Sequence, residues 1–204
     1  MSHDPLILDS DYEPPPQRSR YLHLNKMEPS TSVRFQVLTP TSIGWEWWTE
    51  DAGKYKPNRV ETPITDLAEA PIPAYAKVGK DRNRPKHIWA NVVYNYDENC
   101  LQILSVHQST VQSGLRNTAK EWGSPTDVDY TFVITAPAKD QRAYSVQGVP
   151  ANALPADAKR QAALVDLGVL FDGGDPWEAL DADVPISDDG SWTKKGGFSP
   201  PAGE

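Results

Sequence analysis

One segment, from Lys86 to Val149, constrains the fold of this chain more than any other part of it. The segment begins with two runs that are rich in β-branched and aromatic residues, His87 to Tyr96 and Leu101 to Val106. Three polar residues, Asp97 to Asn99, separate these runs. Because two such runs joined by a short polar link are typical of a β-hairpin, we expect the segment to open with one.

A helix is expected after the hairpin. It should begin near Gln108, because apolar residues then recur at a spacing of four and form one narrow stripe on a helix: Val111, Leu115 and Ala119. The run Gly123-Ser124-Pro125 is typical of a helix end and predicts where this helix stops.

Three more strands complete the predicted order. Asp129 to Thr135 and Arg142 to Val149 alternate around a turn at Ala136-Pro137, and Val33 to Leu38 supplies a strand upstream. A long connection, from Pro40 to Lys86, separates that first strand from the hairpin. A connection of this length usually signals function or disorder.

This order is that of the OB-fold, a partly open barrel that binds oligonucleotides or oligosaccharides on its second and third strands. The loops between strands 1 and 2 and between strands 4 and 5 assist that binding. The predicted fold class is therefore mainly β. We expect a five-stranded OB-fold barrel with one helix between strands 3 and 4, a long insertion between strands 1 and 2, and disordered acidic termini.

The net charge of −8 is distributed unevenly over the 204 residues. Residues 1–16 carry four acids and no bases, residues 17–142 carry 16 bases against 14 acids, and residues 143–204 carry four bases against ten acids. This asymmetry predicts a binding core between acidic tails. The expected division is a disordered arm (1–20), an OB-fold domain (21–150, insertion 40–86), a short helical extension (151–170, helix from Pro155 to Asp166) and an acidic flexible tail with isolated hydrophobic anchors (171–204).

No membrane segment, cofactor or metal site is expected. No apolar run approaches the roughly 18 residues of a membrane span, and the N-terminus has neither the basic start nor the apolar centre of a signal peptide. A cytoplasmic location is therefore expected. The single cysteine, Cys100, and four scattered histidines form no zinc-binding spacing.

Aromatic and basic residues gather in the long insertion and suggest a nucleic-acid interface. The candidates are Trp45, Trp47, Trp48, Lys54, Tyr55, Lys56 and Arg59. Tryptophan rings stack on bases, and neighbouring cations follow the phosphates. The alternative is that Trp45 and Trp47, which share one side of a strand, pack on the barrel; Trp48 is then the exposed ring.

A basic run leads into the predicted second strand and adds candidates for phosphate contact: Lys77, Lys80, Arg82, Arg84 and Lys86. Its alternative is a merely solvated surface. In the strand itself, alternation places Ile88, Ala90, Val92, Tyr94 and Tyr96 toward the core. The other side carries His87, Trp89 and Asn91, so Trp89 is predicted to stack on a base unless a bulge or the insertion buries it.

Two acidic pairs raise the alternative of a metal-dependent nuclease. Asp97 and Glu98 lie in the predicted hairpin turn, and Asp127 and Asp129 precede a strand. Two-metal nucleases need carboxylates that converge on the ions, whereas turn chemistry already explains both pairs. None of the common catalytic motifs for phosphate binding, zinc hydrolysis or nucleophilic serine occurs.

The chain resembles the OB-fold single-stranded DNA-binding proteins of tailed bacteriophages over about residues 20–150. The resemblance rests on the runs YLHLN, VRFQVL, GWEWW, KYKP, PKHIWANVVYNYDENCLQILSVHQSTVQSGL and EWGSPTDVDYTFVIT, with Trp122 to Thr126 the most distinctive. It implies a protein of the host bacterial cytoplasm that coats and protects single-stranded DNA in replication, recombination or repair. An acidic C-terminal tail is then expected to contact replication proteins.

Two features depart from that family. The loop from Ala136 to Asp140 lacks the usual glycine, and the chain ends in WTKKGGFSPPAGE instead of an acidic hydrophobic tip. The nearest match to such a tip lies further inside the chain, so the predicted partner-binding residues are Trp177, Asp181, Asp183, Val184 and Ile186. The acidic tail is also predicted to compete with DNA for the basic groove.

The predicted function is sequence-tolerant binding of single-stranded DNA without catalysis. An OB-fold protein that binds other proteins, as a regulatory or structural phage factor, is the alternative from another class. A metal-dependent nuclease is the third hypothesis.

Overall fold

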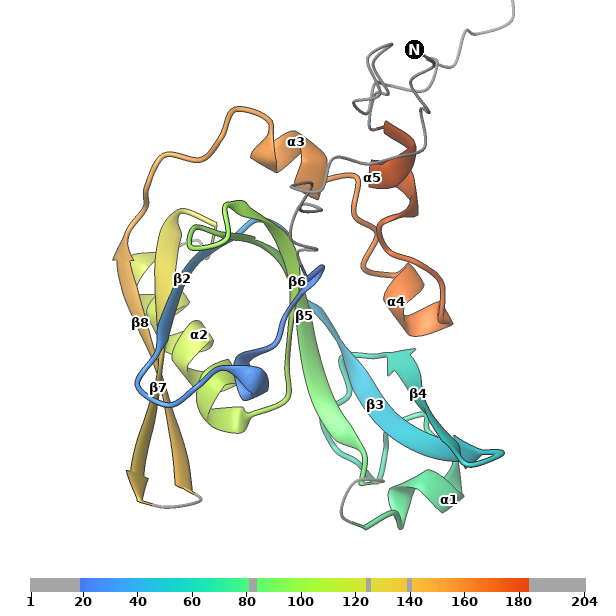
Figure 1. The fold of residues 1–204 in the computed structure, drawn as a ribbon. Helices are drawn as coiled ribbons and strands as arrows, with labels where there is room; N and C mark the ends of the chain where they lie inside the picture. The colour runs from blue at the N-terminus through green and yellow to red at the C-terminus, as the bar shows by residue number, and fades with distance from the viewer. Residues whose placement is uncertain (1–18, 81–83, 124–125, 139–140, 184–204) are drawn as a thin grey trace, which may run out of the picture.

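The computed structural model describes residues 19–80, 84–123, 126–138 and 141–183 (Figure 1). Its strands are β1 (Tyr21–Leu22), β2 (Ser32–Val37), β3 (Ser42–Asp51), β4 (Lys54–Glu61), β5 (Lys86–Asn95), β6 (Cys100–Val106), β7 (Val128–Ala138) and β8 (Gln141–Pro150). The helices are the 3-10 turn η1 (Leu24–Lys26), α1 (Ala74–Lys77), α2 (Ser109–Trp122), α3 (Ala158–Ala162), α4 (Val169–Asp172) and α5 (Glu178–Asp183). None of these described helices is long and apolar enough to cross a membrane.

All eight strands belong to one sheet, which confirms the mainly β prediction. The order of neighbours is β1-β6-β5-β2-β7-β8, and β3 pairs with both β5 and β4. In the described part of the chain the end strands β1 and β8 do not pair with each other, so the sheet does not close into a barrel. The structure thus differs from the predicted five-stranded barrel in strand number and in closure.

The predicted hairpins and the long helix are present. β5 and β6 pair in an antiparallel register from Asn95↔Cys100 to Trp89↔Val106, and α2 follows them. The predicted turn at Ala136-Pro137 is wrong, because β7 continues to Ala138, which pairs with Gln141. The register is irregular between Thr135 and Ala138, where a proline without an N–H is tolerated in a strand.

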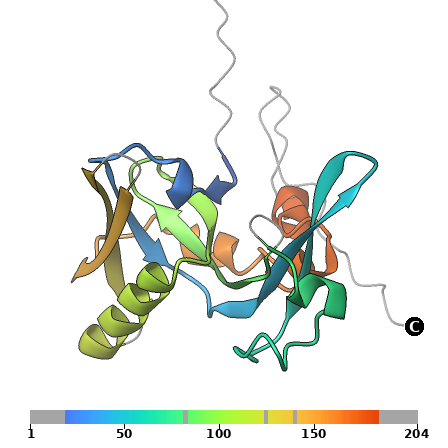
Figure 2. The ribbon, with the colours of Figure 1, turned by 90° about the horizontal axis from the view of Figure 1, so that it is seen from below.

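The insertion forms a second hairpin, β3–β4, in which β3 pairs with the first half of β5 (Figure 2). Its two-residue turn has positive φ at Ala52 (48°) and Gly53 (77°), and Asp51 pairs with Lys54 across it. Positive φ at both central residues is the geometry of a type I′ turn, whose twist matches that of the flanking strands.

The main core lies between the sheet and α2. Val111 and Leu115 of α2 are buried as predicted, but the third buried position is Thr118 instead of Ala119. The strands contribute the largest buried side chains, including Phe35, Leu104, Tyr130, Phe132 and Ile134.

A second core covers the opposite face of β5, and this corrects the predicted role of that strand. Ile88, Ala90 and Val92 were expected to face the barrel interior, yet they pack against α3 and α4, while Val93 faces the main core. The predicted alternation of side chains along β5 is therefore correct, but the main core covers one side of the strand and the second core covers the other. Asn91, expected on an exposed side, is buried and donates to the Thr39 carbonyl oxygen at 3.1 Å.

The C-terminal part that the structure describes is folded, which contradicts the predicted flexible tail over residues 171–183. Leu170, Phe171 and Trp177 are buried against β5 and β6. The predicted helix from Pro155 to Asp166 is shorter, because α3 spans Ala158–Ala162. Residues 184–204, with Val184 and Ile186, and residues 1–18 lie outside the described residues.

Candidate nucleic-acid interface

A groove on the outer face of β5 and β6, with a volume of about 460 Å³, is the candidate interface. We call it the Trp48 groove. Its aromatic walls are Tyr21, His23, Trp48 and His107, its cations are Lys26, Arg59 and Lys86, and its acid is Glu46. Leu170 of α4 borders the groove and also belongs to the second core. The second core and the groove therefore share one face of the sheet.

The alternation of β3 places Trp48 in the groove. Trp45 and Trp47 point to the other side, where residues of the insertion bury them: Ala70, Ile72 and Ala76. Trp48 has the opposite parity and remains partly exposed. Trp45 and Trp47 thus pack as the alternative predicted, although against the insertion and not on a barrel, and Trp48 is the more accessible ring.

A cross-strand ion pair organises the floor of the groove. Glu46 lies opposite Arg59 on β4 and opposite Lys86 on β5. The Arg59 Nη2 is 2.8 Å from the Glu46 carboxylate, and its Nη1 donates to the Leu170 carbonyl oxygen at 3.4 Å. Because Glu46 neutralises Arg59, the excess positive charge of the groove comes from Lys26 and Lys86.

Residues near the N-terminus of the described chain form the opposite wall. Leu22 and Leu24 are buried in the main core, so Tyr21 and His23 point outward. Their rings stack with centroids 5.9 Å apart and planes at 21°. Burial raises the pKa of the Tyr21 hydroxyl above its ordinary value, with Arg59 acting in the opposite direction.

Both groove histidines favour the neutral form. Desolvation lowers the pKa of His23, and the charge of Lys26 lowers it further. Desolvation by the groove walls also lowers the pKa of His107, although this side chain keeps contact with solvent; Lys86 adds to the effect and Glu46 opposes it. An anion in the groove would favour the protonated forms, because it reverses the influence of the neighbouring cations.

Three predicted site residues meet in the Trp48 groove: Trp48, Arg59 and Lys86. Sequence reasoning missed Tyr21, His23, Lys26 and His107 as members of this site. Their placement depends on the parallel pairing of β1 with β6, which no local pattern reveals. The alternation in Tyr21-Leu22-His23-Leu24 was the available signal that two side chains point outward.

Other predicted basic and aromatic residues do not line the groove. Lys54, Tyr55 and Lys56 lie exposed at the tip of β3–β4, and Lys56 pairs with Asp51 at 2.9 Å. Lys77 of α1 donates to the Ala68 carbonyl oxygen, while Lys80 and Arg84 are exposed nearby in sequence. Arg82 lies outside the described residues.

Four predicted contact residues are buried or partly buried: Trp45, Trp47, His87 and Trp89. Trp45 and Trp47 are 6% and 7% exposed, and the Trp45 Nε1 donates to the Ile64 carbonyl oxygen at 2.8 Å. His87 makes an edge contact with Trp45, and burial lowers its pKa. Trp89 packs on the main core, with the Arg116 guanidinium 5.9 Å from its ring centroid.

The predicted tail residues are also engaged. Trp177 is 4% exposed, and the Arg20 guanidinium lies 5.5 Å from its ring centroid. Arg20 also pairs with Asp181 at 2.8 Å, which ties α5 to the chain just before β1. Asp183 is the last described residue.

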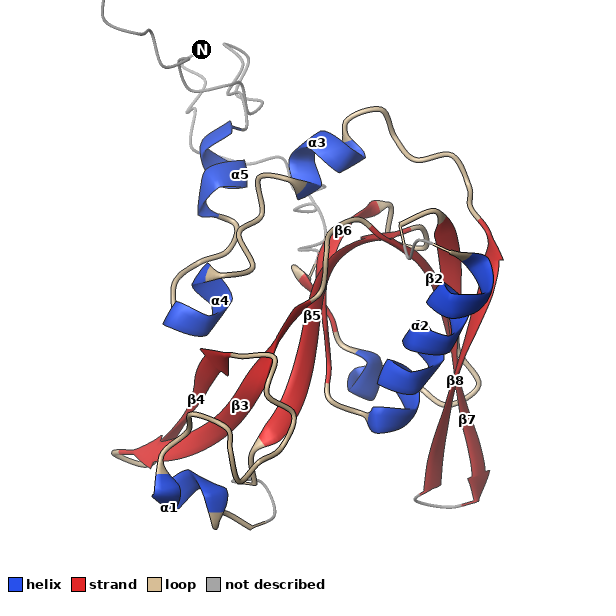
Figure 3. Ribbon diagram, turned by 180° about the vertical axis from the view of Figure 1, so that it is seen from behind, coloured by secondary structure: helices blue, strands red, loops and turns tan. Residues whose placement is uncertain are grey.

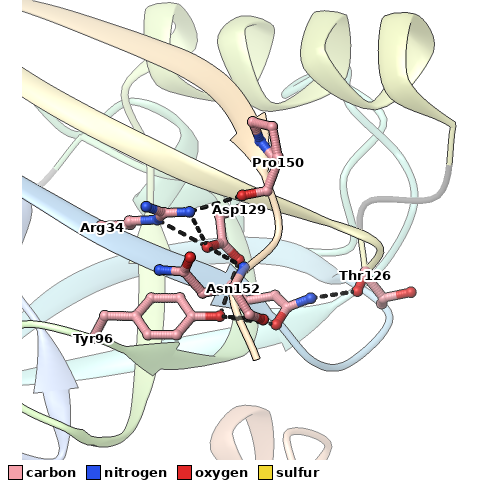
Figure 4. Close-up of polar contacts among 7 residues, drawn as sticks. Arg34, Tyr96, Thr126, Asp129, Pro150 and Asn152 are labelled. Atoms are coloured by element: carbon pink, nitrogen blue, oxygen red, sulfur yellow. Dashed lines mark hydrogen bonds and ion pairs between the residues drawn. The ribbon is translucent and has the colours of Figure 1, made fainter. Parts of the chain in front are cut away.

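The acidic residues of the nuclease hypothesis differ in burial and in their contacts. Asp129 is fully buried and accepts hydrogen bonds from Arg34 Nε at 2.8 Å, Tyr96 Oη at 3.0 Å and the Asn152 backbone N–H at 3.0 Å (Figure 4). Burial, reinforced by Asp129, raises the pKa of Tyr96 well above its ordinary value. Asp127 is exposed. Within the described residues, no three His, Cys, Asp or Glu side chains gather as a metal ion would require.

Comparison with known proteins gives no assignment of function, so the proposal below rests on the geometry of the groove. No protein-family model matches the chain, and no curated protein matches it.

Proposed function

We propose that this protein binds single-stranded DNA in the Trp48 groove, without sequence preference and without catalysis, and coats it in phage DNA replication, recombination or repair. The observation that carries the proposal is the accessible Trp48 ring beside Lys26 and Lys86. A base stacked on such a ring is worth about 1 to 3 kcal/mol whatever its identity. The two lysines supply the charge that phosphates require.

The strand order supports an OB-like reading of the site. Five strands of the sheet are neighbours in the order β6-β5-β2-β7-β8. In the chain, α2 lies between β6 and β7. On that reading β5 and β6 correspond to strands 2 and 3 of an OB-fold, the strands that bind ligand. The Trp48 groove lies on these strands.

The β3–β4 hairpin offers a continuation of the binding surface. Tyr55 is 53% exposed and lies directly opposite Glu50, two positions beyond Trp48 on the same side of β3. Because directly opposed residues share one face of a sheet, Tyr55 lies on the face that carries Trp48. A single strand of DNA that leaves the groove along β3 would thus meet a second aromatic ring, that of Tyr55.

Titration with oligo-dT, followed by tryptophan fluorescence at several salt concentrations, tests the proposal. Affinity should fall steeply with salt, because each phosphate contact releases counterions. Trp48→Ala should weaken binding by about 1 to 3 kcal/mol without changing the salt slope, whereas Lys86→Ala should reduce the slope by about one. The matched controls Tyr75→Ala and Lys120→Ala, exposed residues outside the groove, should change neither quantity.

Absence of binding at low salt would overturn the proposal. Salt-insensitive binding of a protein partner, with no affinity for oligonucleotides, would instead support the protein-interaction alternative. Mg²⁺-dependent cleavage that disappears in Asp127→Ala would support the nuclease.

A further inference from the structure

β8 forms one end of the strand order, whose other end is β1 (Figure 3). It pairs with β7 along its length, from Val128↔Pro150 to Ala138↔Gln141. Among the described strands, none pairs with its other side. An open edge of this kind offers its backbone N–H and C=O groups to another extended chain.

The composition of β8 differs from that of the other long edge strand. β4 also pairs on one side only, and it carries features that discourage a further strand: Lys54, Lys56, Pro57 and Arg59. β8 is ten residues long, and from Ala143 to Val149 it contains no charge and no proline. The sequence of β8 therefore lacks the usual protection of a solvent-exposed edge.

An exposed tryptophan lies beside this edge. Trp122, at the end of α2, is 49% exposed. A Cβ built on Gly148 of β8 would lie 2.9 Å from the Trp122 Nε1, so the indole covers the strand at this glycine. A strand added to this edge would therefore bring its side chains close to the Trp122 ring.

We propose that β8 is a homodimer interface in which two copies pair their β8 strands antiparallel about a two-fold axis at Val146. In this register Ser145 faces the partner's Gln147, and Tyr144 faces the partner's Gly148. Each bulky ring then lies opposite a residue without a side chain, and no like charges face one another. The partner's Tyr144 then comes next to Gly148, on the side of the strand where Trp122 lies.

A self-complementary strand explains why a second copy is the partner. The same ten-residue sequence lies on both sides of the two-fold axis without a clash of charge or size. Its exposed face carries small or neutral side chains at Ala143, Ser145 and Gln147. The dimer leaves the Trp48 groove open, because that groove lies on β3, β5 and β6. The inference does not depend on the proposed function.

Two double variants of opposite charge test the dimer in the full chain. Ser145 and Gln147 are exposed, so S145K/Q147K and S145E/Q147E should both fold, which circular dichroism verifies. Each variant places like charges opposite each other across the axis, and opposed like charges on neighbouring strands are destabilising. We expect sedimentation equilibrium to give dimers for the native chain, monomers for each variant and heterodimers for their equimolar mixture.

Three results would overturn the proposal. The first is a native chain that stays monomeric as its concentration rises, which needs no variant. The second is a pair of variants that remain dimeric, because the interface would then lie elsewhere. The third is a mixture that stays monomeric, because complementary charges should restore the pairing.

Discussion

Asp129 carries a charge into the interior, where its partners determine what its loss costs. Because Arg34, Tyr96 and the Asn152 backbone all donate to its carboxylate, Asp129→Ala leaves several donors without an acceptor. Removal of one partner of a buried ion pair costs about 3 to 5 kcal/mol. We therefore expect urea unfolding to show a free energy of unfolding lower by about 3 kcal/mol.

Asp127→Ala is the matched control for that measurement. Asp127 is exposed, so its replacement should change the free energy of unfolding by no more than about 0.5 kcal/mol. Equal effects of the two substitutions would mean that the Asp129 network contributes nothing to stability.

If the groove binds DNA as proposed, its histidines should make binding sensitive to pH. The pKa values of His23 and His107 are lowered in the free protein, and nearby phosphates would raise them, so binding would take up protons. The groups that face them are Lys26, Lys86, Arg59 and Glu46. Affinity for oligo-dT should therefore increase as the pH falls from about 8 toward about 6, by at most about tenfold per pH unit for each histidine.

Oligo-dT titrations at fixed ionic strength over this pH range check the expectation. His107→Gln should flatten the dependence, while Trp48→Ala should weaken binding and keep the dependence. A pH profile that is identical in the native chain and in His107→Gln would remove His107 from the site.

At the scale of elements, the C-terminal segment has two parts that require separate truncations. Deletion of residues 172–204 removes Trp177, which is buried on β5 and β6, and should lower the free energy of unfolding by about 3 kcal/mol or more. Deletion of residues 184–204 leaves the described helices intact and removes three acids, Asp188, Asp189 and Glu204, together with two bases, Lys194 and Lys195. This shorter deletion tests whether the acidic tail competes with DNA.

Tail competition predicts tighter binding of oligo-dT after deletion of residues 184–204 at low salt. The gain should shrink as the Debye length falls from about 30 Å at 0.01 M to about 8 Å at 0.15 M. Affinity that does not change anywhere in this range would leave the tail without a competitive role.

Local patterns predicted the elements whose signals are local. The hairpin β5–β6 and the stripe of Val111 and Leu115 could be read from the sequence because alternation and helical spacing act over a few residues. β4 escaped prediction because Pro57 argues against a strand, whereas an edge strand tolerates it. The Ala52-Gly53 turn escaped because alanine rarely adopts positive φ.

At the scale of the whole molecule, the site depended on contacts between distant segments. Trp48 could be assigned from parity once Trp45 and Trp47 were assumed to pack. His23, Lys26 and His107 could not, because β1, η1 and the end of β6 meet through long-range pairing. Likewise, the alternation of β5 did not reveal that α3, α4 and Trp177 cover its second face.

The covering of β5 on both faces has a consequence for the order in which the chain is made. Synthesis proceeds from the N-terminus, so β5 and β6 emerge from the ribosome well before residues 162–177 that cover Ile88, Ala90, Val92 and Ile103. During that interval the nascent hairpin exposes an apolar surface that the finished protein hides. Gly44 of β3 is likewise covered only after Phe171 has been translated, because the Phe171 ring lies against it in the complete fold. Residues 162–177, which are translated after β5 and β6, therefore end the exposure of this apolar surface.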